Sequence, residues 1–484
     1  MMKTIRSEKE FTALGGQYGL VSAVMDVSSD GRTASAVYRA LKEGEKRSFL
    51  MEGDGRDVHG GRYSIMGFAP MAIFELHGKE KKGERFLARL HDYLKKARAF
   101  RDPLLPPFAG GLFGFFGYET TVFFDDLFHA SPEKKLPESD LPLSVFFSPG
   151  LTAVFDHREK RVRLSAYVET EGKDERMLAA EYQKTAALLR ERAGRIASSP
   201  PEAACPSFLS KNFSPTVGRE VFMERVAAAR ESIRSGEVYQ IVLSQRFETE
   251  APEDPLALYD ALRRENPSPY HFFFEGPDMT LVGASPEILV RVQGGHVIAR
   301  PLAGTRRRGA TPVEDAALEA ELKADVKERA EHVMLVDLAR NDTARTCLPE
   351  SVAVTEFMEV ERFARVMHIV SQVEGDLRPG ETALDVLRTS FPAGTVSGAP
   401  KIRAMEIIAE LEGEARNSYA GAFCALDYNG DLDSCIAIRT FSISGGKLHL
   451  QVGAGVVFDS DPAAEYQETL HKANALFRAL GPAA

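Results

Sequence analysis

The chain has 484 residues, of which 44% are hydrophobic and 27% are charged. This length and composition exclude a peptide-sized module and argue against extensive disorder, and they predict two or three globular domains. The 60 Lys and Arg residues stand against 70 Asp and Glu residues, for a net charge of −10. Such a balance argues against nucleic acid as a partner, because a polyanion is bound through bulk positive charge.

The cysteines and the apolar runs bear on the cellular compartment. The four cysteines are sparse and form no CxxC pair, which predicts reduced thiols. No apolar run approaches the ~18 residues of a membrane helix, and the first residues lack the apolar core of a signal peptide. We therefore expect a cytoplasmic protein that does not enter a membrane.

Residues 1–200 alternate short apolar runs, such as "YSIMGFAPMAIFEL", with helical patterns such as "ERMLAAEYQKTAALLRERAG". This alternation predicts an α+β region that has little chemistry of its own and that supports or regulates the rest. Residues 201–218 are rich in Ser, Ala and Pro and lack a sustained apolar period, so they predict a linker.

Residues 219–484 contain apolar runs that are broken at GG, NG and GP. These dipeptides are the turn signals expected between antiparallel strands. Amphipathic helices are expected over residues 219–235, 312–343, 400–411 and 462–480. The predicted fold class is therefore α+β, with antiparallel β-sheets packed together and covered by helices.

The segment "FPAGTVSGAPKIRAMEII", residues 391–408, runs from a loop of small residues into a helix. Backbone N–H groups there, with the hydroxyls of Thr395 and Ser397, suit an anion or an oxygen-rich substrate. An ordinary helix start with Pro400 in the first turn explains the pattern equally well. The segment is not a Walker loop, because the G-x-x-x-x-G-K-[ST] spacing is missing.

Two segments place carboxylates at helical spacing. "KERAEHVMLVDLARND" contains Glu328 and Glu331, and "EYQETLHKANALF" contains Glu465, Glu468 and Lys472. Carboxylates that converge from separate helices suit Mg²⁺, which prefers hard oxygen ligands. From spacing alone, however, solvated helix faces are the better explanation.

Three further features carry positive charge or a titratable ring. His368 lies in the strand-like run "RVMHIVSQVEG", as a core histidine or as a general acid. Arg439 ends the apolar run "DSCIAIRT", where its guanidinium needs a carboxylate of the protein or of a substrate. "ARPLAGTRRRG", residues 299–309, either binds an anion or pairs with surface carboxylates. A divalent cation would reconcile these positive groups and an acidic substrate with the nearby glutamates.

From about residue 222 to residue 480 the chain resembles the chorismate-utilising enzymes. The resemblance is carried by long blocks in the family's order: "VYQIVLSQRF", "NPSPY", "GASPE", "RPLAGTRRRG", "ERAEHVMLVDLARND", "VMHIVSQVEG", "FPAGTVSGAPKIRAMEII", "CIAIRT" and "VGAGVVFDSDPAAEYQET". Residues 1–200 match less strongly, through "SFLMEG", "GGRYSIMGFAP" and "AGGLFGFFGYE". The resemblance implies a catalytic domain over residues 219–484.

The resemblance also implies the residues of the site. Glu331 and Glu468 would bind Mg²⁺, which holds the ring carboxylate of chorismate. The implied substrate-binding residues are Gly304, Thr305, Tyr419, Arg439, Gly453, Ala454, Gly455 and Lys472. The implied catalytic residues are Gln240, Glu287, His368 and Thr395. Of these, His368 would help the ring hydroxyl to leave, since hydroxyl is a poor leaving group unless it is protonated.

The family's branches differ in the nucleophile that attacks the ring. Members that use water carry a lysine base where this chain has Gln240, and members that attack with their own lysine carry it where this chain has Ala303. With neither lysine present, the resemblance implies that ammonia attacks ring C2. Loss of the C4 hydroxyl and elimination of pyruvate would then give an aromatic amine, which makes the chain a magnesium-dependent carbon–oxygen lyase.

The source of ammonia and the exact product stay open. None of the four cysteines lies in a G-x-C-x-G nucleophile elbow, so ammonia would come from a separate glutamine amidotransferase subunit or from free ammonium. The rival interpretations are a sister amination enzyme, either one that lacks its usual lysine or one that stops before pyruvate loss. A non-catalytic anion-binding protein is a remote alternative.

Ammonia-using members of the family bind tryptophan as a feedback inhibitor through "LLES" and "NPSPYM" elements. Here the matching segments are "LMEG", residues 50–53, and "NPSPYH", residues 266–271. Because Gly53 replaces a serine and His271 replaces a methionine, we expect tryptophan inhibition that is weaker or altered. The expected tryptophan-binding residues are Leu50, Glu52, Gly53, Pro269, Tyr270 and His271.

Overall fold

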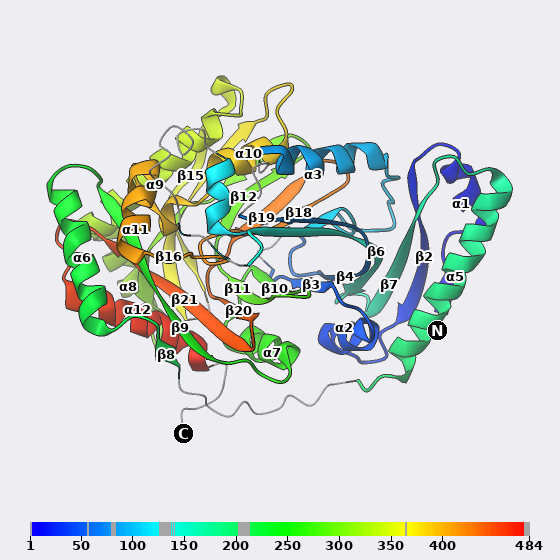
Figure 1. The fold of residues 1–484 in the computed structure, drawn as a ribbon, viewed down its shortest axis with the longest axis horizontal. Helices are drawn as coiled ribbons and strands as arrows, with labels where there is room; N and C mark the ends of the chain where they lie inside the picture. The colour runs from blue at the N-terminus through cyan, green and yellow to red at the C-terminus, as the bar shows by residue number, and fades with distance from the viewer. Residues whose placement is uncertain are drawn as a thin grey trace.

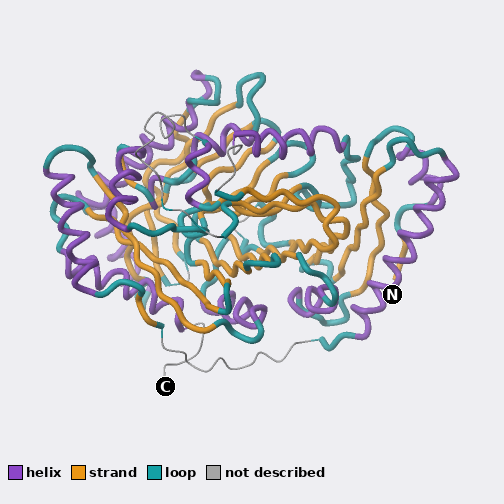
Figure 2. The backbone as a smooth tube through the Cα atoms, viewed as in Figure 1, coloured by secondary structure: helices purple, strands orange, loops and turns teal. Residues whose placement is uncertain are grey.

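The computed structural model describes residues 2–55, 58–78, 84–124, 137, 139, 141–201, 213–363 and 365–478. Antiparallel strands fill the centre of the molecule, and helices cover its two ends and its outer faces (Figure 1, Figure 2). Every pairing between named strands is antiparallel. The predicted fold class is thus confirmed.

The strands form two sheets. Neighbouring strands of the first sheet are, in order, β1 (Met2–Thr4), β2 (Leu20–Ser28), β7 (Arg161–Glu169), β6 (Ser144–Asp156), β4 (Tyr63–Leu76), β3 (Ser48–Glu52), β10 (Tyr270–Glu275), β11 (Thr280–Ser285), β20 (Thr440–Ser444), β21 (Lys447–Val456) and β9 (Gln240–Glu250). The short β8 (Ser214–Pro215) and β17 (Gly398–Ala399) pair with the two ends of β9.

The second sheet begins where β6 pairs with β5. Its strands are, in order, β5 (Leu112–Phe116), β18 (Ala422–Leu426), β19 (Leu432–Ile436), β12 (Ile288–Gln293), β13 (His296–Ala299), β16 (Val366–Asp376) and β15 (Ala353–Arg362), and β14 (Leu302–Arg307) pairs with the other half of β16. The long strands β4 and β6 run through both sheets. A bulge between Pro70 and Ala72 interrupts their register between the two sheets.

Aromatic side chains fill the space between the sheets. Phe49 of β3 stacks on Phe113 of β5 with ring centroids 4.1 Å apart. Phe272 of β10 stacks on Phe423 of β18 at 4.3 Å, with the two ring planes within 2° of parallel. Alternate residues of a strand point to opposite faces, so these phenylalanines all come from the inward face of their strands. The stacked rings hold the two sheets together.

Helices cover the outer faces of both sheets. Apolar side chains of α1 (Glu8–Gly15), α2 (Ala34–Lys42), α5 (Glu175–Ser198) and α7 (Pro255–Glu265) pack on the first sheet. Those of α3 (Glu84–Ala97) and α10 (Ala383–Ser390) pack on the second sheet. α6 (Arg219–Arg234), α11 (Lys401–Glu412) and α12 (Pro462–Phe477) pack around β9 and β21. The short helical turns η1 (Tyr118–Phe123), η2 (Pro349–Ser351) and η3 (Gly394–Val396) lie in connections.

The prediction of one helix over residues 312–343 is wrong. The structure has two helices there, α8 (Pro312–Ala324) and α9 (Val326–Ala344). Asp325 separates them, because its carboxylate accepts hydrogen bonds from the backbone N–H groups of Lys327 and Glu328 and thereby starts a new helix. The last predicted helix is α12, and the end expected for it at residue 480 lies outside the described residues.

The regions assigned to residues 1–200 and 219–484 contribute strands to both sheets. β3 pairs with β10 in the first sheet, and β5 pairs with β18 in the second. Most of the predicted linker, residues 202–212, lies outside the described residues. The division into these regions stays a prediction about the chain's function.

Two further expectations concern thiols and membranes. The cysteines in the described part of the chain are free and buried, as expected, and they are Cys347, Cys424 and Cys435; Cys205 lies outside that part. Among the described helices, none combines the length and apolar character that crossing a membrane requires.

Replacing Phe272 by Ala should lower the free energy of unfolding by about 4 kcal/mol, because the change removes a stacked ring and leaves a cavity between the sheets. Urea denaturation monitored by circular dichroism measures this loss. The matched control is Phe458→Ala, since Phe458 is 57% exposed and its loss should cost no more than about 0.5 kcal/mol. Equal losses in the two variants would contradict the role given to the stacked pair.

Candidate active site

Gln240 and a run of small residues lie where β9 and β21 pair. Gln240 begins β9, and the register places Gly455 opposite Val242 and Gly453 opposite Ser244. A Cβ at Gly455 would lie 2.9 Å from Gln240 Nε2, and one at Gly453 would lie 2.5 Å from the hydroxyl of Tyr419. The strand backbone therefore lies close to these two side chains, and a larger residue at either position would force one of them to move.

Two glutamates approach this strand pair from different helices. Gln240 Nε2 donates to Oε1 of Glu331 on α9 at 2.8 Å. Lys472 on α12 donates to the carbonyl oxygen of Gly453 at 2.8 Å and forms an ion pair with Glu468 one turn earlier at 2.7 Å. The structure thus brings Gln240, Gly453, Lys472 and both predicted metal ligands to the same end of the β9–β21 pair.

Each predicted metal ligand has a second carboxylate beside it. Burial raises the pKa of Glu328, and the charge of Glu331 adds to the rise. Burial also raises the pKa of Glu465, aided by the charge of Glu468. Such like-charged groups fit a cation between the helices, since a cation would offset their repulsion. Over the described residues no three His, Cys, Asp or Glu side chains form a ready metal cluster, so water or substrate oxygens would complete the coordination.

His368 lies on β16, and its ring contacts Gly304 and Thr305 of the paired strand β14. Its Nδ1 lies 3.0 Å from the carbonyl oxygen of Gly304 and 3.0 Å from Oγ1 of Thr305. A carbonyl oxygen only accepts hydrogen bonds, so Nδ1 carries the hydrogen and Nε2 is the atom that exchanges a proton. Gly304 has φ +70°, and a Cβ there would lie 3.3 Å from a carboxylate oxygen of Glu328. This part of β14 therefore lies between His368 and Glu328 of α9.

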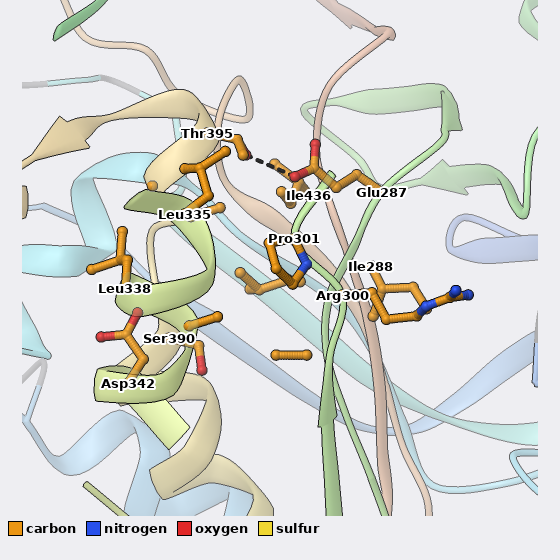
Figure 3. Close-up of a pocket in the computed structure, with 15 residues that line it drawn as sticks. Glu287, Ile288, Arg300, Pro301, Leu335, Leu338, Asp342, Ser390, Thr395 and Ile436 are labelled. Carbon is orange, nitrogen blue, oxygen red and sulfur yellow. Dashed lines mark hydrogen bonds between the residues drawn. The ribbon is translucent and has the colours of Figure 1, made fainter. Parts of the chain in front are cut away.

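Glu287, Thr395 and Arg439 form a second group. Thr395 Oγ1 donates to Glu287 Oε1 at 2.9 Å (Figure 3). Burial raises the pKa of Glu287 to about 7, although Thr395 and Arg439 act against the rise. Burial also lowers the pKa of Arg439, and in the described part of the chain its guanidinium has no ion pair or hydrogen bond. Of the two partners that the sequence left open, a carboxylate of the protein or of a substrate, the first is not in contact with the Arg439 guanidinium among the described residues, so the guanidinium can bind an anion.

A pocket that is partly open to solvent adjoins this group. Glu287 lines it on one side, Leu335, Leu338 and Asp342 of α9 line it on the other, and Thr395 lies next to Leu335 (Figure 3). The pocket thus reaches from the Glu287–Thr395 hydrogen bond to α9, the helix that carries Glu331.

The three arginines of residues 306–308 pair with carboxylates of the protein. Arg306 forms ion pairs with Glu321, Asp325 and Glu328, with distances of 2.8, 2.8 and 3.1 Å between the charged atoms. Arg308 forms a two-pronged contact with Asp315 and also donates to a backbone carbonyl. The cluster therefore fastens β14 to α8 and α9, and it is not an anion-binding site of its own.

Only some of the residues expected to bind tryptophan line the same pocket. Glu52, Pro269 and Tyr270 line a small pocket whose other lining residues include aromatic rings. Leu50 instead lies in the apolar cluster on the helix-covered face of the first sheet. The lining residues of this pocket are Met51, Glu52, Val58, His59, Tyr63, Ile65, Phe108, Pro269, Tyr270, Ala425 and Asp433, and they include neither Gly53 nor His271.

The carboxylate of Glu52 is buried but charged. Burial alone would raise its pKa, but the charge of Arg263 and hydrogen bonds from Tyr259 and Ser64 lower the pKa below its usual value. His271 is buried too, and its Nε2 lies 2.9 Å from the carbonyl oxygen of Asn266. Burial lowers the pKa of His271, so the ring is neutral.

Sequence reasoning missed three buried residues near the site: Glu119, Glu412 and Arg416. Arg416 pairs with Glu412 at 2.6 Å, and both side chains are almost fully buried. Glu119 accepts a hydrogen bond from the backbone N–H of Arg416 across 297 residues of sequence. No local sequence pattern predicts contacts between residues that lie so far apart in the sequence.

Comparison with known proteins agrees with this geometry. The family of chorismate binding enzymes matches residues 46–478. Anthranilate synthase component 1 of Streptomyces coelicolor is 42% identical over 483 residues, which cover 99% of this chain and 92% of the relative. Anthranilate synthase component 1 of Acetivibrio thermocellus is 38% identical, with 97% of each chain covered.

A solved structure shows the same relationship. The crystal structure of anthranilate synthase component I from Streptococcus pneumoniae TIGR4 superposes with a TM-score of 0.75 at 36% identity. The match covers 86% of this chain and 92% of that one. On the family match and the near-complete coverage of its relatives, the chain belongs to the family of chorismate binding enzymes.

Proposed function

We propose that the chain converts chorismate and ammonia to anthranilate and pyruvate, the first step of tryptophan biosynthesis. Its relatives of nearly full coverage are anthranilate synthase components 1. The observation that carries the proposal is the side chain of Gln240, whose amide donates to Glu331. An amide cannot take a proton from water at neutral pH, and Ala303 has no amine, so the nucleophile is a free ammonia molecule.

His368 is the proton donor of the first step. Its Nδ1–H is held by Gly304, so the protonated Nε2 gives its proton to the C4 hydroxyl, which leaves as water while the nitrogen of ammonia bonds to C2. In the second step the C2 proton passes to the enolpyruvyl methylene carbon and the bond between C3 and the ether oxygen breaks. Pyruvate and the aromatic ring of anthranilate result.

The two acidic ends of the substrate would be held by different groups. Arg439 and the hydroxyl of Tyr419 would bind the enolpyruvyl carboxylate next to the backbone N–H groups of Gly453, Ala454 and Gly455. Glu331 and Glu468 would hold Mg²⁺, which supplies positive charge opposite the ring carboxylate. Thr305 and Lys472 would line the space between the two carboxylate-binding positions. Glu287 and Thr395 would keep Arg439 in place.

The designation component 1 implies a partner subunit for the relatives. For this chain we propose that the partner is a glutamine amidotransferase subunit that supplies ammonia. We further propose that residues 1–200 support and regulate the catalytic residues 219–484. Tryptophan would bind in the pocket lined by Glu52 and Tyr270, where a buried negative charge faces the amino group of an amino acid and aromatic rings face its indole. The protein would work in the cytoplasm.

The direct test is incubation of the chain with chorismate, Mg²⁺ and ammonium at pH 8.5, followed by the blue fluorescence of anthranilate. Ammonium should support turnover, and glutamine without a partner subunit should not. Accumulation of a non-aromatic amino product would favour a sister amination enzyme. Absence of any turnover of chorismate would overturn the proposed function.

Changing Glu331 or Glu468 to Gln should lower kcat at least 100-fold, because each change removes one negative charge that holds Mg²⁺. EDTA should abolish the activity of the unmodified chain, and added Mg²⁺ should restore it. Asp337→Asn is the matched control, since Asp337 lies on α9 with its side chain 61% exposed. Circular dichroism checks that each variant is folded; a folded Glu331→Gln protein with full activity would show that the metal site lies elsewhere.

Tryptophan should inhibit the chain with a half-inhibitory concentration above the low micromolar range. Gly53→Ser should lower that concentration at least fivefold, because the change restores the serine of the related inhibitor-binding element. Gly218→Ser is the control, since a Cβ at Gly218 meets nothing within 4 Å and this residue is remote from the pocket. Low micromolar inhibition of the unmodified chain would contradict the prediction.

A further inference from the structure

Arg416 is a buried arginine that joins three elements of the active site. Its Nε and Nη2 bind the two carboxylate oxygens of Glu412, at the end of α11, at 2.8 and 2.6 Å. Its Nη1 donates to the carbonyl oxygen of Val396 in η3 at 2.8 Å, and Nη2 donates to that of Val242 in β9 at 2.7 Å. All of these bonds are made to the protein, so the guanidinium is not left over for a substrate.

The elements that Arg416 joins carry residues of the site. Val396 follows Thr395, and Val242 lies two residues after Gln240 and opposite Gly455. The carboxylate of Glu412 also accepts from the backbone N–H and the hydroxyl of Ser244 at 2.7 and 2.9 Å. The Arg416–Glu412 pair therefore fixes η3 against β9, and with it Thr395 against Gln240.

The backbone of Arg416 begins a turn, residues 416–421, that carries Tyr419. Two residues of this turn, Asn417 and Ala420, have positive φ angles of +55° and +62°. Each such residue costs of order 1 kcal/mol outside glycine, so the turn needs support from elsewhere. Glu119 of η1 gives that support, because its two carboxylate oxygens accept from the N–H groups of Arg416 at 2.6 Å and Asn417 at 3.0 Å.

The same turn also sets the position of Arg439. Ala420 N–H donates to the carbonyl oxygen of Ala437 at 3.1 Å, and Ala437 N–H donates to that of Gly421 at 2.8 Å. Arg439 follows two residues later, itself at φ +50°. On the other side, the guanidinium of Arg416 lies 5.6 Å from the ring centre of Tyr419. Tyr419 and Arg439 are thus held in one arrangement by the turn.

We propose that Glu119 and Arg416 are positioning residues, which hold the turn of residues 416–421 so that Tyr419 and Arg439 together bind a carboxylate of the substrate. The inference rests on the proposed function, because it assumes chorismate as that substrate. Glu119 lies in the N-terminal region and Arg416 in the C-terminal region. The N-terminal region therefore contributes to substrate affinity directly, in addition to any regulation.

The test is the variant Glu119→Gln. An amide has one acceptor oxygen for the two N–H donors, and its NH₂ group would face the second donor, so the turn loses one of its two supports. The KM for chorismate should rise at least tenfold, while kcat changes less than threefold, because the proton donor His368 and the nucleophile are unaffected. A role in stability alone would lower the amount of active protein and leave KM unchanged.

Asp102→Asn is the matched control for a buried carboxylate. Asp102 pairs with Arg6 at 2.7 Å and accepts from the N–H of Leu104 at 3.0 Å, and it makes no hydrogen bond to the turn. Its loss should lower the melting temperature and leave KM for chorismate within twofold. Glu119→Asp keeps both acceptor oxygens and should give an intermediate KM, which decides the matter if Glu119→Gln does not fold.

Arg416→Lys provides a second, independent change. Lysine keeps the charge beside Glu412 but cannot make the planar set of four bonds to three elements, so KM should again rise at least tenfold. The unmodified chain is assayed first: if it forms no anthranilate, the proposed function fails. If it is active and the folded Glu119 and Arg416 variants keep KM within twofold, the positioning role is overturned.

Discussion

The pairing of β9 with β21 is the interaction on which the active site depends. It runs without a break from Ile241 opposite Val456 to Glu250 opposite Lys447. Because the register is continuous, the side chain of Gln240 and the glycines of β21 meet at one end of the ladder. α9 and α12 approach that end, and each brings a glutamate to it. A one-residue slip would turn Gln240 to the opposite face of the sheet and away from Glu331.

Much of this arrangement could be predicted from short segments. The antiparallel fold follows from alternating apolar runs and their turn dipeptides. Gly304, Glu331 and His368 lie in sequence blocks that are typical of the family, so each could be identified from its own short segment. The contact between Gln240 and Glu331 spans 91 residues, so no local pattern contains it. The break between α8 and α9 could not be predicted, because Asp325 lies in a polar run that is compatible with one continuous helix. The sequence does not show that its carboxylate accepts hydrogen bonds from the following N–H groups.

The charges of the site explain why its residues come from so many elements. In the proposed site a substrate with two carboxylates would lie beside Glu331 and Glu468, so it would need positive charge that carboxylates of the protein do not already neutralise. The arginines of residues 306–308 cannot do this, since they are already paired with carboxylates of α8 and α9. Arg416 is paired with Glu412 as well. Arg439 remains, held near but not against the buried Glu287.

The choice of nucleophile depends in the same way on which side chains of the site carry an amine. A lysine amine in place of the Gln240 amide would lie next to Glu331 and could act as a base for water, whereas the amide only donates a hydrogen bond to that carboxylate. Ala303 on β14 removes the other amine, and its backbone pairs with Ile369 beside His368. The side chains of Gln240 and Ala303 are therefore both neutral, and neither one competes with a neutral ammonia molecule as the nucleophile. A site with no lysine at either of these two positions would depend on ammonia brought from outside.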